Sequence, residues 1–290
     1  MDGSEIAREM NVLGRFLGRR DVDALDQTEL DRAIGHARAD VMVLYGGSVL
    51  GGVDVLADAM RADVARTYVI SGGAGHTTAT LRETVRRSVP GLDVPDDVTE
   101  AELLASVLER RHGLTPDLLE TRSTNCGNNI TFVLDLLAER EISARDVIIC
   151  QDATMQLRMD AGMRAASPET TVVDYATYEV EVACVADHGS PLALPLGGTR
   201  GAIDYVGDVP EGMWDVGRYL TLLMGEVPRL RDDGQGYGPK GRGWIAHVDV
   251  PEAVLEAQAA LSSAFPASVR TADPAYAGPA SEPSCDRGPC

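Results

Sequence analysis

Short apolar runs that end at glycine or polar residues alternate with amphipathic stretches along the first two thirds of the chain. The clearest run is residues 41–45, which two glycines follow directly. A short apolar run without polar alternation is typical of a strand buried on both faces of a parallel sheet. Such strands, alternating with helical stretches, predict an α/β fold with a doubly wound, mainly parallel sheet and helices on both faces. The predicted strands lie at residues 41–45, 67–70, 118–120, 147–150 and 171–175.

The segments on either side of this core differ from it in composition. Residues 1–35 carry apolar positions at helical spacing and predict two short N-terminal helices. The α/β core is predicted over residues 36–190, and residues 191–265 predict a smaller, mostly helical and loop-rich part that packs on it. Residues 266–290 contain five of the fifteen prolines, with alanine, serine and glycine between them. This composition predicts a disordered tail.

The balance of charge limits the classes of partner. The chain has 26 Lys and Arg residues against 45 Asp and Glu residues, a formal net charge of −19, so nucleic-acid backbones and anionic lipids would repel it. No apolar run approaches the roughly 18–20 residues of a membrane span, and the first residues do not resemble a signal peptide. The five cysteines lack the spacing of zinc ligands. We therefore expect a cytoplasmic protein with a small-molecule ligand and without nucleic-acid, membrane or metal partners; the oligomeric state is left open.

Glycine-rich loops follow the first two predicted strands. In a doubly wound sheet, ligands bind beyond the carboxyl ends of the strands, near the point where the strand order reverses. Glycines there let backbone N–H groups approach an anion, and the next helix adds the positive end of its dipole. Neither loop has a standard dinucleotide-binding or P-loop motif. The alternative is that the glycines only form tight turns with a positive φ and bind no ligand. Two such loops in succession favour a ligand site, with candidate contacts at Gly46, Gly47, Ser48, Gly72 and Gly73.

A dense polar run after the third predicted strand is the next candidate. It precedes an apolar helix that we place from Ile130. One or two hydroxyls or amides suffice to cap that helix, so the surplus fits a polar wall for a ligand with hydroxyl or phosphate groups. Cys126 lies near the helix N-terminus, but the sequence identifies no histidine or acid partner that would make it a nucleophile. The candidate ligand contacts here are Glu120, Ser123, Thr124 and Asn125.

Three further residues have side chains suited to catalysis or to binding charge. Asp152 follows the fourth predicted strand, where an acid can bind ribose hydroxyls, act as a base or merely cap the next helix. Arg158 lies in that helix, as either an anion clamp or a surface ion pair. His76 is the only histidine on a predicted ligand-side loop, although a buried or capping role would also explain it. The catalytic candidates are therefore His76 and Asp152.

A basic segment interrupts the acidic chain at residues 228–243. Four Lys and Arg residues against two Asp residues give it a local charge of +2, and aromatic residues lie beside it. We predict a glycine-rich loop that closes over an anionic or adenine-like ligand, with Arg229 as a contact. The alternative is that the segment only pairs with the acidic body and anchors the C-terminal part.

Taken in chain order, these segments resemble the YdcF/SanA/ElyC-type family, over about residues 8–260. The resemblance implies a Rossmann-like fold with an additional, mostly helical part, an unanchored cytoplasmic protein and an association with S-adenosylmethionine. The resemblance does not identify a reaction. The sequence carries the resemblance in residues 46–47, 71–77, 120–129, 151–156, 219–239 and 247–249.

The chain departs from that family at two positions. Asn128 stands where the family usually has Glu, and Thr154 or a neighbour stands where many members have His before an Arg. If those residues carry chemistry in the wider family, this chain has lost or changed it.

Three functional hypotheses follow. The first is a small-ligand-binding protein whose ligand is S-adenosylmethionine or another adenosyl or nucleotide compound. The second is a transferase or hydrolase that acts on a phosphorylated or nucleotide-linked small molecule, with His76 or Asp152 as the base and Arg158 or Arg229 as the charge stabiliser. The third is an acidic scaffold that recruits partner proteins.

Overall fold

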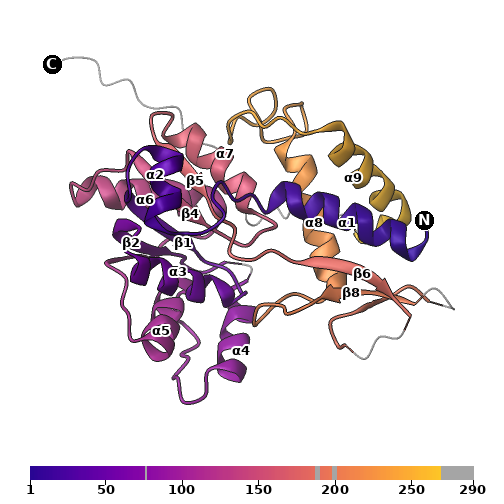
Figure 1. The fold of residues 1–290 in the computed structure, drawn as a ribbon, viewed down its shortest axis with the longest axis horizontal. Coiled ribbons are helices and arrows are strands. Elements are labelled where there is room, and N and C mark those ends of the chain that lie inside the picture. Colours follow the sequence, from indigo (N-terminus) through magenta and orange to yellow (C-terminus); the bar gives the residue numbers. More distant parts are fainter. Residues whose placement is uncertain (76, 187–189, 198–200, 269–290) are drawn as a thin grey trace.

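A sheet of five parallel strands forms the centre of the computed structural model, which describes residues 1–75, 77–186, 190–197 and 201–268 (Figure 1). The strand order is β3-β2-β1-β4-β5, so the order reverses between β1 and β4. This arrangement confirms the predicted Rossmann-like, doubly wound α/β fold. The strands are β1 (Ala39–Tyr45), β2 (Ala65–Ser71), β3 (Leu118–Glu120), β4 (Asp146–Cys150) and β5 (Thr171–Asp174).

Helices cover both faces of the sheet because each central strand is apolar on both sides. In β1, Met42 and Leu44 belong to one buried cluster, whereas Val41 and Val43 belong to the other. The first cluster packs against α2 (Gln27–Ile34), α3 (Gly51–Ala62), α4 (Thr78–Ser88) and α5 (Glu100–His112), and the second against α6 (Cys126–Glu139) and α7 (Gln156–Ala166).

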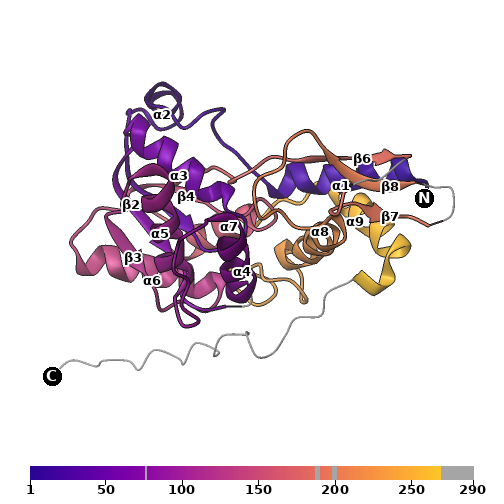
Figure 2. The same ribbon diagram turned by 90° about the horizontal axis from the view of Figure 1, so that it is seen from below.

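A second body packs beside the sheet (Figures 1 and 2). Its apolar core includes Leu157 and Ala161, so α7 joins the two bodies. The sequence predicted its helices but not its small antiparallel sheet, because the strands are short and partly exposed and lack a continuous apolar run. The body contains α1 (Gly3–Leu17), β6 (Glu181–Val185), β7 (Leu194–Pro195), β8 (Ala202–Val206), α8 (Val216–Leu230), α9 (Glu252–Ala264) and a short 3-10 helix (Pro266–Ser268).

The two N-terminal helices belong to different bodies. The apolar face of α1 packs in the second body, whereas Leu30 of α2 is buried with the core. Residues 266–268 close the described chain, and the rest of the predicted disordered tail lies outside the described residues. In the part of the chain that the structure describes, no helix has the length and apolar character needed to cross a membrane.

Candidate functional site

The carboxyl ends of the strands meet at one edge of the sheet. Tyr45 at the end of β1 pairs with Ser71 at the end of β2, and Ser71 pairs with Glu120 at the end of β3. The loop after β4 reaches the same edge on the other side of the reversal, because Leu44 pairs with Cys150. The predicted ligand-side loops therefore lie together, where doubly wound sheets bind their ligands.

Glu120 organises the polar run that follows β3. Its carboxylate is buried and accepts hydrogen bonds from the Ser71 hydroxyl (2.9 Å) and from the backbone N–H groups of Arg122 (2.6 Å) and Ser123 (3.0 Å). Both oxygens thus have protein partners. Glu120, a predicted ligand contact, therefore holds the loop in shape in this structure.

Ser123 connects this run to the glycine loop after β2. The Gly73 backbone N–H donates to the Ser123 hydroxyl at 3.1 Å, and the Asn129 amide group bridges Ser123 (2.7 Å) and Ser71 (2.9 Å). Asn129 was not among the predicted contacts. Its position in the helix gave no sign that its side chain turns back toward the strand ends.

The remaining polar residues of the run begin α6. The Asn125 side chain accepts from the Asn128 backbone N–H at 3.0 Å and caps the helix. Thr124 is exposed and donates to the Asn128 side chain at 3.2 Å. The helix consequently starts at Cys126, earlier than the predicted Ile130. Some of the polar side chains that were expected to face a ligand therefore belong to the cap of this helix.

Three of the predicted glycines allow close packing of the backbone. A Cβ on Gly46 or Gly72 would come closer than 3.0 Å to the side chain of Glu100. A Cβ on Gly73 would collide with the carbonyl oxygen of Ser123. Close packing therefore accounts for these three glycines, and none of them has the positive φ on which the tight-turn explanation depends.

Replacement of Gly73 by alanine is expected to lower the free energy of unfolding by about 1–3 kcal/mol, because the backbone of the polar run must shift to make room. Urea denaturation followed by circular dichroism measures this. The matched control is Gly234→Ala, where a Cβ would have no neighbour within 4 Å. Equal midpoints for the two variants would contradict the packing role of Gly73.

Glu100 is a buried acid that the sequence analysis missed. It is the first residue of α5, and its Oε1 accepts hydrogen bonds from the hydroxyls of Thr77 (2.9 Å) and Thr78 (2.7 Å). Burial raises the pKa of its carboxyl in spite of these two hydrogen bonds. In the sequence Glu100 is an ordinary acid in the first turn of a helix, so no local signal identifies it.

Asp152 joins the two bodies. Its Oδ1 accepts hydrogen bonds from the Thr154 backbone N–H (2.9 Å), the Thr154 hydroxyl (2.7 Å) and the Tyr178 hydroxyl (2.7 Å). Its Oδ2 accepts from Trp214 Nε1 at 2.9 Å. Burial, together with the charge of Asp152, raises the pKa of Tyr178 well above its ordinary value. Both oxygens of this predicted catalytic residue are thus engaged in holding the structure.

Residues 207–215 form a segment that lies across the loop after β1, and we name it the cover segment. The Leu50 backbone N–H donates to the carbonyl oxygen of Glu211 at 2.9 Å, and the Glu211 carboxylate pairs with Arg111 of α5. Trp214, at the other end, donates to Asp152. The cover segment is therefore fastened to the core at three points.

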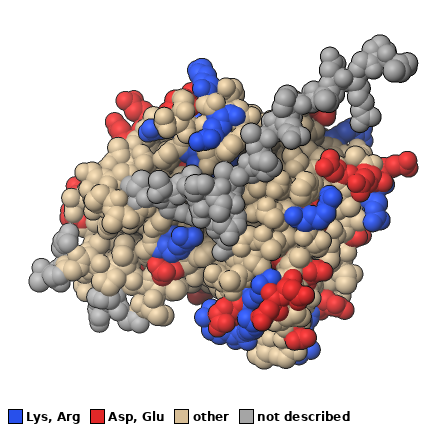
Figure 3. Space-filling view, turned by 180° about the vertical axis from the view of Figure 1, so that it is seen from behind, with Lys and Arg blue, Asp and Glu red and all other residues tan. Residues whose placement is uncertain are grey.

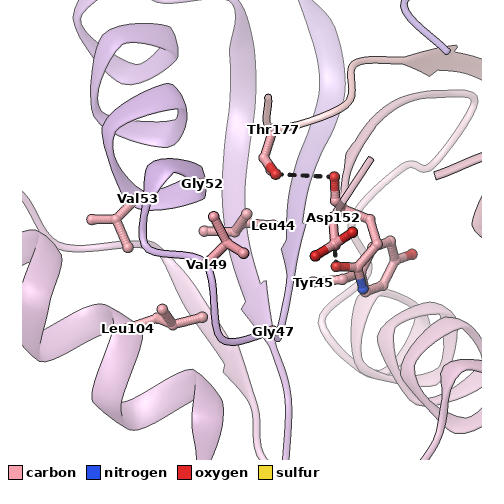
Figure 4. Close-up of a pocket in the computed structure, with 10 residues that line it drawn as sticks. Leu44, Tyr45, Gly47, Val49, Gly52, Val53, Leu104, Asp152 and Thr177 are labelled. Carbon is pink, nitrogen blue, oxygen red and sulfur yellow. Dashed lines mark hydrogen bonds between the residues drawn. The ribbon is translucent and has the colours of Figure 1, made fainter. Parts of the chain in front are cut away.

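A small cavity remains at the strand reversal, beside Gly47. A Cβ on Gly47 would meet only Gln151 Oε1 at 3.5 Å, an ordinary contact, so this glycine is not needed for packing. The free volume is about 10 Å³, room for about one water molecule. Figure 4 shows apolar side chains on one side of it and polar ones on the other, namely Leu44, Val49, Val53 and Leu104 facing Asp152 and Thr177.

Ser48 follows Gly47 and is fully buried. Its hydroxyl has no hydrogen-bond partner among the described atoms. A buried polar group without a partner costs free energy, so such groups are uncommon in folded proteins.

Arg158 and Arg229 share one buried carboxylate. Arg158 donates from Nε and Nη2 to the two oxygens of Glu226 at 2.5 and 3.2 Å, and Arg229 Nη1 lies 3.7 Å from Oε1. Burial acts to lower the pKa of Arg158, but the Cys126 sulfur and the Glu226 carboxylate outweigh it and raise that pKa. Arg158 is therefore not the exposed surface ion pair that the sequence left open, since its side chain is 15% exposed.

The prediction that places Arg229 in a loop is wrong. It lies in the last turn of α8, which continues through Pro228 to Leu230. Buried apolar side chains at Leu223, Val227 and Leu230 keep one face of the helix against the second body, and this packing outweighs the hydrogen bond lost at the proline.

Two other cations of the basic segment have local partners: the Lys240 ammonium lies 3.7 Å from Asp232, and Arg242 lies over the ring of Trp244. Asp232 accepts a hydrogen bond from the Lys240 backbone N–H at 2.6 Å and lies 2.9 Å from His247 Nδ1. The Arg242 guanidinium lies 5.1 Å from the ring centre of Trp244. In Figure 3, basic and acidic side chains lie side by side rather than forming one large area of a single sign.

A comparison with protein-family models found no match for this chain. In the described ranges, no group of three or more His, Cys, Asp or Glu side chains is arranged to hold a metal ion. His76 lies outside the described residues, so its role as an acid or base stays a prediction.

Proposed function

We propose that this chain is a small-ligand-binding protein of the YdcF type, and that it binds S-adenosylmethionine or a related adenosyl or nucleotide compound where β1 and β4 end. The observation that carries the proposal is the buried, unpartnered hydroxyl of Ser48, which directly follows the cavity-lining Gly47 in the chain. A ligand oxygen or amine at this point would supply the missing hydrogen bond.

The two-sided cavity lining supports the same class of ligand. Apolar side chains suit a base, and the polar side near Thr177 and Gln151 suits a sugar or an amino-acid group. The cavity has room for about one water molecule. Binding of a nucleotide or an adenosyl compound therefore requires the cover segment to move away from residues 48–51.

Thermal-shift and calorimetric titrations with S-adenosylmethionine, S-adenosylhomocysteine, AMP and ATP test the proposal. At least one of them is expected to raise the melting temperature at millimolar concentration. Native mass spectrometry of freshly purified protein would identify a ligand that co-purifies. If none of the compounds shifts the melting temperature, the proposal fails.

Gly47→Ala is expected to weaken binding of that ligand at least about tenfold with little change in stability. The new methyl group enters the ligand space but meets the protein only at an ordinary contact distance. Gly234→Ala serves as the control and should bind as the unmodified protein does. Unchanged affinity in Gly47→Ala would place the ligand elsewhere.

The alternative of a transferase or hydrolase stays a prediction. Both oxygens of Asp152 already accept hydrogen bonds, which does not favour this residue as a base. His76 lies outside the described residues, so no described contact tests it. The partner-binding scaffold is likewise untested.

A further inference from the structure

Glu100 has a buried carboxylate at the edge of the sheet where β1 and β2 end. The residue is 6% exposed, and it packs against Gly46 and Gly72, the glycines that directly follow these two strands. Leu104 lies one turn further along α5 and lines the small cavity beside Gly47 (Figure 4). Residues four apart share one face of a helix, so the carboxylate lies at the side of the proposed ligand site.

The two oxygens of this carboxylate have different surroundings. Oε1 accepts both hydroxyl hydrogen bonds, whereas Oε2 has no hydrogen-bond partner among the described atoms. The buried side-chain oxygens of the described residues that lack both a partner and contact with solvent are those of Tyr45, Ser48 and Asp174. Oε2 of Glu100 is not in this group, so solvent reaches it at the edge of the sheet.

The hydroxyls that hold Oε1 come from the start of α4. Thr77 occupies the N-cap position of α4, but its side chain makes no capping hydrogen bond and donates to Glu100 instead. Thr78 accepts from the Gly75 backbone N–H at 2.7 Å and donates its own proton to Oε1. α4 thus forgoes a stabilising cap, and α5 has a capping box of its own that does not use Glu100. These contacts fix Oε1 as an acceptor and leave Oε2 to a partner from outside.

No cation of the described residues pairs with this carboxylate. Arg82 acts on Glu100 through its charge, but its guanidinium donates from Nε and Nη2 to the carbonyl oxygen of Val98 at 3.2 and 2.6 Å. Burial outweighs this charge and raises the pKa of Glu100. The buried carboxylate of Glu226, by contrast, pairs with two arginines. A buried carboxylate without a paired cation is costly, and a cationic ligand group would remove that cost.

We infer that Oε2 of Glu100 binds an ammonium group of the ligand at the edge where β1 and β2 end. An ammonium supplies the N–H donor that Oε2 lacks, together with the positive charge that no described residue pairs with the carboxylate. The two threonine hydroxyls hold the carboxylate in place, and the glycines at 46 and 72 leave the room that it occupies. The inference deepens the proposed function, on which it rests for the identity of the rest of the ligand.

Methylammonium chloride is the probe, because it carries the ammonium group alone. It should raise the melting temperature of the unmodified protein by about 1–3 °C at tens of millimolar, relative to tetramethylammonium chloride, which has the same charge but no N–H donor. Glu100→Gln should lose this difference, since the amide keeps an oxygen for the two threonine hydroxyls but removes the charge and the acceptor at Oε2. Glu109→Gln removes an exposed acid from the same helix and should keep the difference.

Two results would overturn the subsite: equal effects of the two salts on the unmodified protein, or an equal methylammonium effect in Glu100→Gln and Glu109→Gln. The first comparison needs no variant, so it holds even if Glu100→Gln does not fold.

A pair of adenosyl compounds separates this subsite from the proposed function. Glu100→Gln should weaken the binding of 5′-amino-5′-deoxyadenosine about 10–100-fold, the effect of one lost hydrogen bond to a charged group, and that of adenosine much less. If adenosyl compounds bind but neither amine gains anything over its control, the proposed function survives and the subsite fails. If methylammonium acts through Glu100 and no adenosyl compound binds, the subsite stands and the proposed function fails.

Discussion

Replacement of Asp152 by alanine is expected to lower the free energy of unfolding by about 3–5 kcal/mol. The carboxylate accepts hydrogen bonds from Thr154, Tyr178 and Trp214, and alanine leaves these buried donors without an acceptor. Because Trp214 belongs to the cover segment, the loss also loosens the contact between the two bodies. Urea denaturation monitored by tryptophan fluorescence and by circular dichroism measures both effects.

Asp135→Ala is the matched control, since Asp135 is an exposed acid in the middle of α6. Its unfolding midpoint should stay near that of the unmodified protein. If Asp152→Ala unfolds at the same midpoint as this control, the carboxylate does not hold the bodies together.

Stability is expected to fall as the pH rises from about 5 to 8, because of Asp174 at the end of β5. Burial and the nearby carboxylate of Asp160 raise the pKa of Asp174 from 3.8 to about 8, with Asp21 adding to the shift. A hydrogen bond from Gln156 and the charge of Arg19 oppose this rise. Between these pH values the folded state holds a proton that the unfolded state has lost. The free energy of unfolding therefore falls by about 1.4 kcal/mol per pH unit from this group.

Asp174→Asn removes this titration and is expected to flatten the profile. Near pH 5 the variant and the unmodified protein should have similar stability, because asparagine resembles the protonated acid in shape. By pH 8 the variant should be the more stable by several kcal/mol. Denaturation curves at pH 5, 6, 7 and 8 measure the difference, with Asp135→Asn as control. If the difference in free energy of unfolding between Asp174→Asn and the unmodified protein stays constant from pH 5 to 8, Asp174 is already ionised at pH 5.

The strands and the edge at which they end could be predicted from local patterns. The runs at residues 41–45 and 147–150 are apolar on both faces, and glycine or polar residues mark their ends. The start of α5 is a local feature of the same kind, since the side chains and backbones of Thr99 and Glu102 form the reciprocal hydrogen bonds of a capping box. These signals are local because the backbone period and the cap each depend on a few neighbouring residues.

The roles of the polar residues could not be predicted in the same way. Asp152 was a candidate base, but its partner Trp214 lies 62 residues further along the chain. Arg158 and Glu226 are separated by 68 residues, and only the packing of α8 against α7 brings them together. An acidic residue whose carboxylate accepts hydrogen bonds from distant donors looks the same in the sequence as one whose carboxylate is free to bind a ligand.

The glycine-rich loops after β1 and β2 show which features the sequence determines and which depend on the tertiary structure. The sequence by itself determined a doubly wound sheet, the edge where its loops gather and an acidic chain around it, because these follow from periodicity, turn residues and charge. Only the tertiary structure decided that Gly46, Gly72 and Gly73 serve packing while Gly47 borders a small cavity, and that the hydroxyls of Tyr45 and Ser48 are buried without partners among the described atoms. The physical reason is that close contact and desolvation depend on atoms brought together from distant parts of the chain.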